Sequence, residues 1–272
     1  MIFETSGEVR KMKSFWFSVM SLVAVCALFM GCAKKNDATF TVGFDAEFPP
    51  YGFKDEKTGE YTGFDLDLAQ EVAFRRGWKL VKKPINWDAK DMELSSKAID
   101  CIWNGFTIQG REGKYTFSEP YVDNSQVIMV KLTSPIKTLA DLKGKVVMAQ
   151  TDTPVLKALQ KGGDKAELGA TFADLRTSAN YVNAIMELEA GSVDAVAVDI
   201  GVAKEKMNGV PGKFRILDEI VLTEQYGIGF LLGNEKLRDE VQATFKEMVK
   251  DGTAAKISKK WFDGKDVIIL KP

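Results

Sequence analysis

From Thr39 onward, short apolar runs alternate along the chain with segments whose apolar residues recur every three or four positions. Short apolar runs bounded by turn residues are typical of buried strands, and the longer spacing is typical of helices with one buried face. Strands that alternate with helices in this way form largely parallel sheets covered by helices. The alternation therefore predicts an α/β fold for the chain that follows residue 38.

The expected strands cover residues 39–44, 78–82, 99–103, 126–131, 145–149, 168–172, 194–198, 214–217 and 226–231. One helix is expected between Gly63 and Gly77, where Asp65 can cap its start and the apolar residues share one face. The other helices are expected at residues 88–97, 154–161, 178–190, 200–207, 235–250 and 252–260. Residues 120–124 and 222–226 are candidate connections between two lobes, and a chain that crosses at both would make one lobe discontinuous.

Residues 15–30 form the longest apolar run, which is short for a membrane span and has the length of a signal-peptide core. Basic residues precede this run, and it closes on Gly31 and Cys32. The segment resembles a bacterial lipoprotein signal, with residues 1–31 as signal peptide, Cys32 as the lipidated first residue and 32–38 as tether. The alternative is an uncleaved N-terminal anchor, and Met12 is an alternative start to Met1.

The chain contains 37 Lys and Arg, 38 Asp and Glu, three cysteines and no histidine. Without histidine, the chain has no Ser-His-Asp or Cys-His couple and no HExxH zinc site, which argues against most hydrolase chemistry. We also expect no metal site and no catalytic residue. The formal net charge of -1 gives no basic footprint for nucleic acid. Cys101 is the cysteine left once Cys26 leaves with the leader and Cys32 is acylated, so no intramolecular disulfide is expected; within a predicted strand, Cys101 is expected to be buried.

Five stretches, in this order, resemble the extracellular solute-binding proteins of family 3, the polar amino-acid receptors of bacterial ABC importers. The stretches are FDAEFPPYGF at 44–53, YTGFDLDL at 61–68, IDCIWNGFTI at 99–108, FSEPY at 117–121 and VDAVAVD at 193–199. The resemblance runs from about residue 40 to 262. It implies a two-lobed periplasmic-binding-protein fold of type II, with two hinge strands and a ligand in the cleft between the lobes. Lobe 1 would comprise residues 39–122 and 226–272, and lobe 2 residues 123–225.

A zwitterionic amino acid needs a fixed cation for its carboxylate and a fixed anion for its ammonium, in a desolvated cleft. Arg111 is the candidate cation, because its planar fork can hold a carboxylate with two hydrogen bonds; in isolation it would be an ordinary loop arginine. Asp199 follows an apolar run, where ligands bind in α/β sheets, although it is also placed to be a helix N-cap. The resemblance makes Asp199 the partner of the ligand ammonium, with the Gly105 carbonyl and the Thr107 hydroxyl completing that site; Thr107 could otherwise be a plain strand-end residue.

Thr153 has the position of a helix N-cap, and Pro154 that of the first helical residue. This helix start resembles the loop of the second lobe that holds the ligand carboxylate in the family. Two residues depart from the family pattern, because Asp152 stands where glycine is common and Pro154 lacks an N–H. The loop before Arg111 is also shorter than in many members.

Phe48 and Trp87 are the candidate walls of the cleft, with Tyr51 as a third, although buried aromatic residues usually belong to the core. Four polar residues are candidates to read the far end of the ligand side chain, namely Asp45, Glu47, Asn104 and Gln150. In the family, the position of Asp45 is associated with ligands that carry N–H donors.

The resemblance implies capture of a polar or cationic L-amino acid, such as arginine, lysine or glutamine, and its delivery to an ABC permease and its ATPase. The receptor would act without a cofactor, as a monomer anchored by lipid to a bacterial membrane, in the periplasm or at the cell surface. Two alternatives stay open. One is a secreted enzyme of the cyclohexadienyl-dehydratase type, with Glu93 or Glu47 as the acid or base, and the other is an amino-acid sensor or adhesin without transport.

Overall fold

The computed structural model describes residues 38–272, which form one compact unit. The predicted signal peptide, Cys32 and the tether up to residue 37 lie outside the described residues. Within residues 38–272, no helix is both long and apolar enough to cross a membrane.

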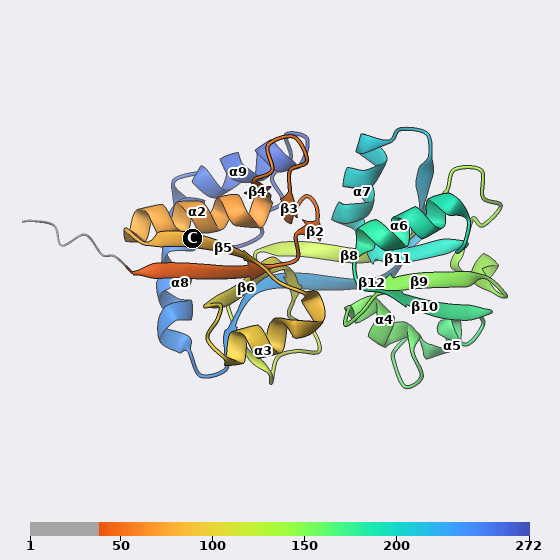
Figure 1. Cartoon of the computed structure of the whole chain (residues 1–272), viewed down its shortest axis with the longest axis horizontal. Coiled ribbons are helices and arrows are strands. Elements are labelled where there is room, and N and C mark those ends of the chain that lie inside the picture. Colours follow the sequence, from red (N-terminus) through yellow and green to blue (C-terminus); the bar gives the residue numbers. More distant parts are fainter. Residues whose placement is uncertain (1–37) are drawn as a thin grey trace, which may run out of the picture. The chain divides into compact units, whose positions relative to one another are not determined.

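One sheet runs through the whole unit, in the strand order β10-β9-β11-β8-β12-β6-β1-β5, and β7 pairs with β12 (Figure 1). Its strands are β1 Thr39–Phe44, β5 Lys79–Pro84, β6 Cys101–Thr107, β7 Tyr115–Phe117, β8 Val122–Lys131, β9 Val146–Gln150, β10 Asp174–Ser178, β11 Ala195–Asp199 and β12 Phe214–Leu231. A small second sheet contains β2 Glu47–Phe48, β3 Gly52–Lys54 and β4 Tyr61–Thr62.

The helices gather around two groups of strands (Figure 1). The first lobe, as we use the term, has β1 to β7 with α2 Phe64–Arg76, the 3₁₀ turn η1 Trp87–Ala89, α3 Lys90–Ser95, α8 Glu235–Lys250 and α9 Thr253–Trp261. The second lobe has β9 to β11 with the 3₁₀ turn η2 Leu139–Leu142, α4 Pro154–Leu159, α5 Ala166–Gly169, α6 Tyr181–Ala190 and α7 Ile200–Gly209.

Parallel pairing dominates inside each lobe, as the sequence predicts. Strand β1 pairs in parallel with β5 and β6, and β9 pairs in parallel with β10 and β11. The carboxyl ends of β1 and β6 and those of β9 and β11 therefore lie at the edge of each lobe where α/β sheets bind ligands.

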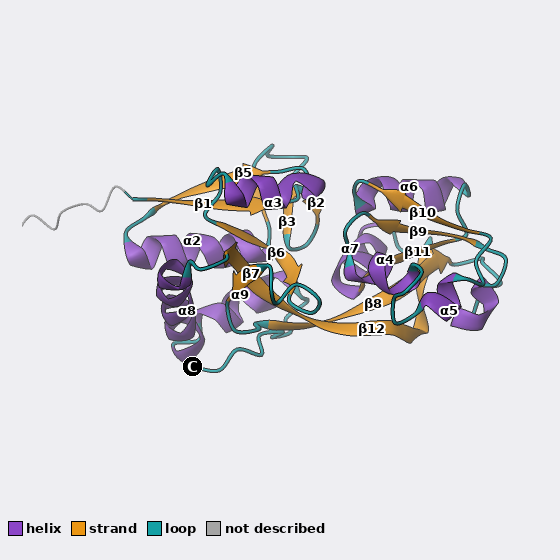
Figure 2. Ribbon diagram, turned by 90° about the horizontal axis from the view of Figure 1, so that it is seen from below, coloured by secondary structure: helices purple, strands orange, loops and turns teal. Residues whose placement is uncertain are grey.

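Two long antiparallel strands, β8 and β12, join the lobes (Figure 2). Strand β12 pairs with β6 and β7 through residues 226–231 and with β11's neighbour β8 through residues 214–226. Because the backbone passes between the lobes in only a few strands, the lobes can move relative to each other by a hinge motion.

Three local predictions are wrong. Residues 168–172 were expected as a strand, but α5 ends there and the strand is β10, a half-exposed edge strand whose polar sequence hid it from a search for apolar runs. Residues 214–217 and 226–231 form one strand, because the polar stretch between them pairs with β8. Asp65 does not cap α2; Gly63 holds the N-cap position.

Gly63 is required by its backbone, which has a φ of 143°. A Cβ at this position would lie 2.3 Å from the carbonyl oxygen of Tyr51. Asp65 is instead fully buried, and its carboxylate accepts hydrogen bonds from the Gly105 N–H at 2.6 Å and the Tyr121 hydroxyl at 2.9 Å. The residue that was expected to start a helix therefore ties α2 to the strand that carries Gly105.

Candidate ligand-binding site

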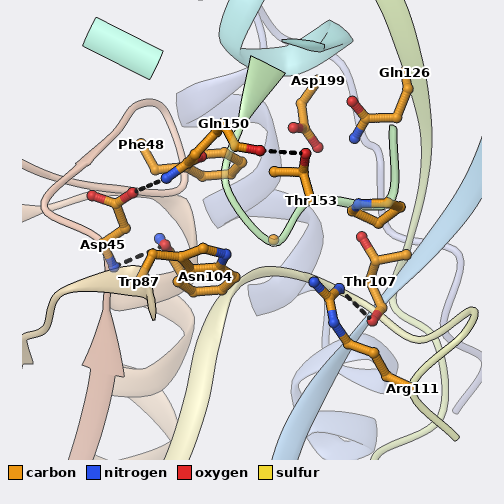
Figure 3. A pocket seen from close by; sticks show the side chains of 12 residues that line it. Asp45, Phe48, Trp87, Asn104, Thr107, Arg111, Gln126, Gln150, Thr153 and Asp199 are labelled. Atoms are coloured by element: carbon orange, nitrogen blue, oxygen red, sulfur yellow. Dashed lines mark hydrogen bonds between the residues drawn. The ribbon is translucent and has the colours of Figure 1, made fainter. Parts of the chain in front are cut away.

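A pocket lies between residues of the two lobes (Figure 3). The lining includes ten of the candidate ligand-binding residues, and among the candidates for walls and side-chain recognition only Tyr51 and Glu47 are missing from it. The ten are Asp45, Phe48, Trp87, Asn104, Gly105, Thr107, Arg111, Gln150, Thr153 and Asp199. Gln126 and Pro154 complete it.

The fold brings these residues together through the ends of its strands. Asp45 follows β1, and Asn104, Gly105 and Thr107 belong to β6. From the second lobe, Gln150 ends β9 and Asp199 ends β11. The sheet topology thus brings together residues that are more than 100 positions apart along the chain, such as Asp45 and Gln150.

Gly105 allows a close approach between the strand and an aromatic wall. Its φ is 55°, in the left-handed region, and a Cβ would lie 2.9 Å from Cε1 of Phe48. Burial raises the pKa of Asp65, which accepts from the Gly105 N–H, to about 7. The backbone at Gly105 is therefore held by a buried carboxyl group from α2.

The Arg111 guanidinium is buried, with 4% of the residue exposed. Its Nη1 donates to the Thr107 carbonyl at 3.2 Å, its Nη2 donates to the Asp152 carbonyl at 2.6 Å, and its Cζ lies 4.7 Å from the centre of the Phe106 ring. Two of the five N–H donors of the guanidinium are engaged in these bonds, and Nη2 also lies 3.8 Å from Asp152 Oδ2. The other three donors remain for an anion.

Asp152, which the sequence analysis noted as a departure from an expected glycine, has the left-handed backbone conformation that glycine adopts easily, with a φ of 52°. Its carboxylate forms ion pairs with Lys90 of the first lobe and with Lys157 of α4, the latter at 2.5 Å. Burial acts to raise the pKa of Asp152, but the bonds with Lys157 and Lys90 lower it to about 2. Asp152 therefore adds an ionic contact between the lobes.

Asp199 also lines the pocket, on the side away from Asp45, and is 3% exposed (Figure 3). It is the N-cap residue of α7, but its side chain makes no capping bond. Its Oδ1 accepts from the Asn124 Nδ2 at 2.8 Å and from the Tyr226 hydroxyl. Burial raises the pKa of this carboxyl group. The carboxylate is thus directed toward the pocket by partners from both long strands rather than used to cap a helix.

Asp45 and Gln150 meet at the far end of the pocket. The Gln150 Nε2 donates to Asp45 Oδ2 at 2.8 Å and to the Ala179 carbonyl at 3.0 Å, while the Glu47 N–H donates to Asp45 Oδ1 at 2.9 Å. The Asp45 N–H donates to Asn104 Oδ1 at 3.0 Å, and Asn104 Nδ2 is buried without a partner. Burial raises the pKa of Asp45. This end offers both a carboxylate and an unused amide donor.

Thr153 caps α4 as predicted, because its Oγ1 accepts from the Leu156 N–H at 3.4 Å. The same hydroxyl donates to the Gln150 carbonyl at 2.8 Å (Figure 3). Pro154 is the first residue of α4 and also lines the pocket. The turn is therefore closed by its own side chain, and the missing N–H of Pro154 leaves no intrahelical bond unmade.

Phe48 and Trp87 are both nearly buried and both line the pocket. Trp87 meets the Phe106 ring edge-on, with the centroids 5.6 Å apart, and Phe48 packs near Tyr181 of α6 at 5.8 Å. Tyr51 is a core residue that does not line the pocket. Glu47 lies outside it as well, and Glu93 pairs with Lys83 at 2.7 Å. Within the part of the chain that the structure describes, no cluster of three or more acidic or cysteine side chains could hold a metal ion.

Gln126 is the polar lining residue that the sequence analysis missed. Buried Asn124 and Gln126 alternate along β8 with exposed Asp123 and half-buried Ser125, so the buried face of this strand is polar. Glu224 of β12 is buried beside them. The signal that could have found them is the period of two itself, because polar residues at the buried positions of a strand are unusual unless they have partners.

A model of the bacterial extracellular solute-binding proteins, family 3, matches residues 40–264. The L-cystine-binding protein TcyJ of Escherichia coli is 33% identical over 236 residues, which is 86% of this chain and 85% of TcyJ.

Solved structures resemble the fold over most of the chain. The substrate-binding protein of an ABC uptake transporter from Streptococcus pneumoniae, with bound histidine, is 30% identical with a TM-score of 0.80, over 85% of this chain and 95% of that one. An ancestral arginine-binding protein bound to arginine is 37% identical with a TM-score of 0.74, over 83% and 98%. The predicted two-lobed periplasmic-binding-protein fold is confirmed.

Proposed function

The chain belongs to family 3 of the bacterial extracellular solute-binding proteins, and from that premise we propose that it captures an L-amino acid between its lobes for an ABC importer. The single observation that carries the proposal is the composition of the pocket. It holds a buried guanidinium and a buried carboxylate, Arg111 and Asp199, with aromatic walls and a second carboxylate at the far end. This set matches the three parts of a cationic or polar amino acid.

The ligand carboxylate binds the free donors of Arg111 in this proposal. The guanidinium is fixed by the Thr107 and Asp152 carbonyls, so little side-chain entropy is lost when the ligand binds. The ligand ammonium binds Asp199 through Oδ2, because both side-chain donors seen at Asp199 reach Oδ1. The Gly105 carbonyl and the Thr107 hydroxyl accept its remaining hydrogens, since a buried donor without a partner costs about 1–3 kcal/mol.

The ligand side chain passes between Phe48 and Trp87 and ends at Asp45 and Gln150. A guanidinium, ammonium or amide there would replace the Gln150 donor on Asp45, which favours arginine, lysine or glutamine over glutamate or aspartate. L-Cystine is a second candidate, because TcyJ is an L-cystine-binding protein. The distal half of cystine carries an ammonium group, which could donate to Asp45, and a carboxylate, which the free Asn104 amide could meet.

We propose that the two lobes close over the ligand by a hinge motion about strands β8 and β12. Lobe 1 comprises residues 39–122 and 226–272, and lobe 2 comprises residues 123–225. The relatives and neighbours reported above are amino-acid-binding proteins, in one case of an ABC uptake transporter, and the family is extracellular. These likenesses support a place outside the cytoplasmic membrane. We further propose that the protein is held there as a monomer through lipidated Cys32, with an ABC permease and its ATPase as partners.

A thermal-shift screen of the purified protein against the twenty amino acids, ornithine, cystine and prephenate tests this function. Ligand at 100 times its dissociation constant stabilises the folded state by about 2.7 kcal/mol. The proposal expects the largest shift with arginine, lysine, glutamine or cystine. If prephenate alone stabilised the protein and was also turned over by it, the dehydratase alternative would be indicated instead. If an amino acid stabilised the protein but was not taken up in a transport assay, the protein would be a sensor or adhesin.

A further inference from the structure

Asp199 has a buried acidic neighbour, Glu224 of β12, which is 4% exposed. One amide bridges the two acids, because Asn124 Nδ2 donates to Asp199 Oδ1 at 2.8 Å and to Glu224 Oε1 at 2.6 Å. The two carboxyl groups are therefore close enough to share one donor, and both are almost fully buried.

This pair forms no direct ion pair among residues 38–272. Arg111 lines the same pocket as Asp199, but none of the ion pairs in this part of the chain includes Asp199 or Glu224. The other titratable groups that face the pair are the hydroxyls of Tyr51, Tyr181 and Tyr226, whose pKa values burial raises well above the ordinary range. These tyrosines stay neutral, and the remaining neighbours of Glu224 are the neutral side chains of Asn124, Gln126 and Thr107.

Two buried oxygen atoms next to the pocket have no hydrogen-bond partner, Glu224 Oε2 and Gln126 Oε1. Gln126 Nε2 donates to Glu224 Oε1 at 2.7 Å, which fixes the orientation of this amide. Gln126 lines the pocket beside Asp199 (Figure 3). A buried acceptor left unpaired is costly, so the Gln126 oxygen points to a donor that the ligand supplies.

We propose that Glu224 is a positioning residue of the ammonium site, and that it shares with Asp199 one proton that leaves when a ligand ammonium enters. The inference rests on the proposed function. Glu224 orients Gln126, whose Oε1 shares with the Thr107 hydroxyl one of the three ammonium hydrogens. The charges balance, because the empty pair with one proton carries -1, and the fully ionised pair with a bound ammonium also carries -1. The proton passes to solvent and the ammonium keeps its own three.

The acidity of the pair agrees with this geometry. Burial and then the charge of Asp199 raise the pKa of Glu224 to about 7, and burial raises the pKa of Asp199. An incoming positive charge favours the ionised form and lowers these pKa values. Affinity should therefore increase with pH up to about 7, and by at most about tenfold per pH unit for a single released proton.

Calorimetric titration between pH 6 and 7.5, in two buffers of different ionisation enthalpy, counts the protons released. The ligand is L-arginine, or whichever amino acid stabilises the protein most in the screen. The wild type is expected to release up to one proton per ligand. Glu224→Gln should release none, lose the pH dependence, and bind about tenfold more weakly at pH 7.5. The matched control is Glu205→Gln on α7, a half-buried glutamate whose pKa burial also raises and which lies outside the pocket; it should behave as the wild type.

The wild-type titration is decisive even if Glu224→Gln does not fold. Amino-acid binding without proton release across this pH range would overturn the inference and leave the proposed function intact. Proton release that persists unchanged in a folded Glu224→Gln variant would do the same. A wild type that binds none of the screened amino acids would overturn both.

Discussion

The side chains of Asp45 and Gln150, which come from different lobes, hydrogen-bond to each other at 2.8 Å at the far end of the pocket. Both are buried, and Gln150 donates the N–H that Asp45 accepts. A ligand that carries its own N–H donor can take the place of Gln150 at this carboxylate. The contact thus defines where side-chain selectivity is expected to arise.

Asp45→Ala should weaken binding of a cationic ligand by tenfold or more, because a charge-assisted hydrogen bond is worth about 1.5–3 kcal/mol. Affinity for a ligand without a distal donor should change less, since the groups that hold its ammonium and carboxylate remain. Calorimetry with arginine and with a small neutral amino acid gives the comparison. Glu47→Ala, at an exposed residue outside the pocket, is the control, and equal losses for both ligands in Asp45→Ala would argue against this role.

Arg111→Ala and Asp199→Ala should each reduce amino-acid affinity about 100-fold or more, while the protein remains folded. Each variant leaves one charged end of the zwitterion buried and unpaired, which is the costly arrangement. Arg76→Ala is a suitable control, because Arg76 pairs with Glu240 on the surface. Near-normal calorimetric affinity in either pocket variant would show that the residue does not bind the ligand.

Lys90→Met should weaken ligand binding by about tenfold, because it removes the ion pair with Asp152 that joins the lobes in this structure. Lys90 is almost fully buried, and its Nζ also lies 5.1 Å from the centre of the Trp87 ring. Lys157→Met removes the other partner of Asp152, which belongs to the same lobe, and should have a smaller effect. Equal effects of the two variants on the dissociation rate would show that the Lys90 contact does not hold the lobes together.

The ligand-free protein should lose stability as the pH rises from about 5 to 7. Burial raises the pKa values of Asp65 and Glu224 to about 7, so the folded state binds more protons than the unfolded state in this range. Each group should contribute on the order of 3 kcal/mol. Urea unfolding at pH 5, 6, 7 and 8 measures the change, and a free energy of unfolding that increases with pH across this range would contradict the assignment. Glu224→Gln should reduce the loss.

The strand ends and the charged pair of the site could be predicted from the sequence, because apolar runs mark the central strands and ligands bind where such strands end. Local patterns fail where tertiary pairing decides the structure. The polar residues 218–225 look like a loop, yet they continue β12 because β8 lies beside them. Likewise Asp65 is of a residue type that often caps helices, but it is buried and accepts hydrogen bonds from Gly105 and Tyr121. Both partners follow it by at least 40 residues, so local sequence does not reveal them. Gln126 and Glu224 were missed because their relation to Asp199 exists only once the two long strands pair.

The most direct test of the central claim is an equilibrium titration of the wild-type protein with L-arginine, L-lysine, L-glutamine and L-cystine by isothermal calorimetry. The account predicts one binding site per chain for at least one of them, with a dissociation constant in the micromolar range or below, about -8 kcal/mol or better. It also predicts no binding of the corresponding amine that lacks the carboxylate, because the buried Arg111 charge would then have no ligand anion to pair with. Absence of binding by all four amino acids, or equal binding of the decarboxylated amine, would contradict it.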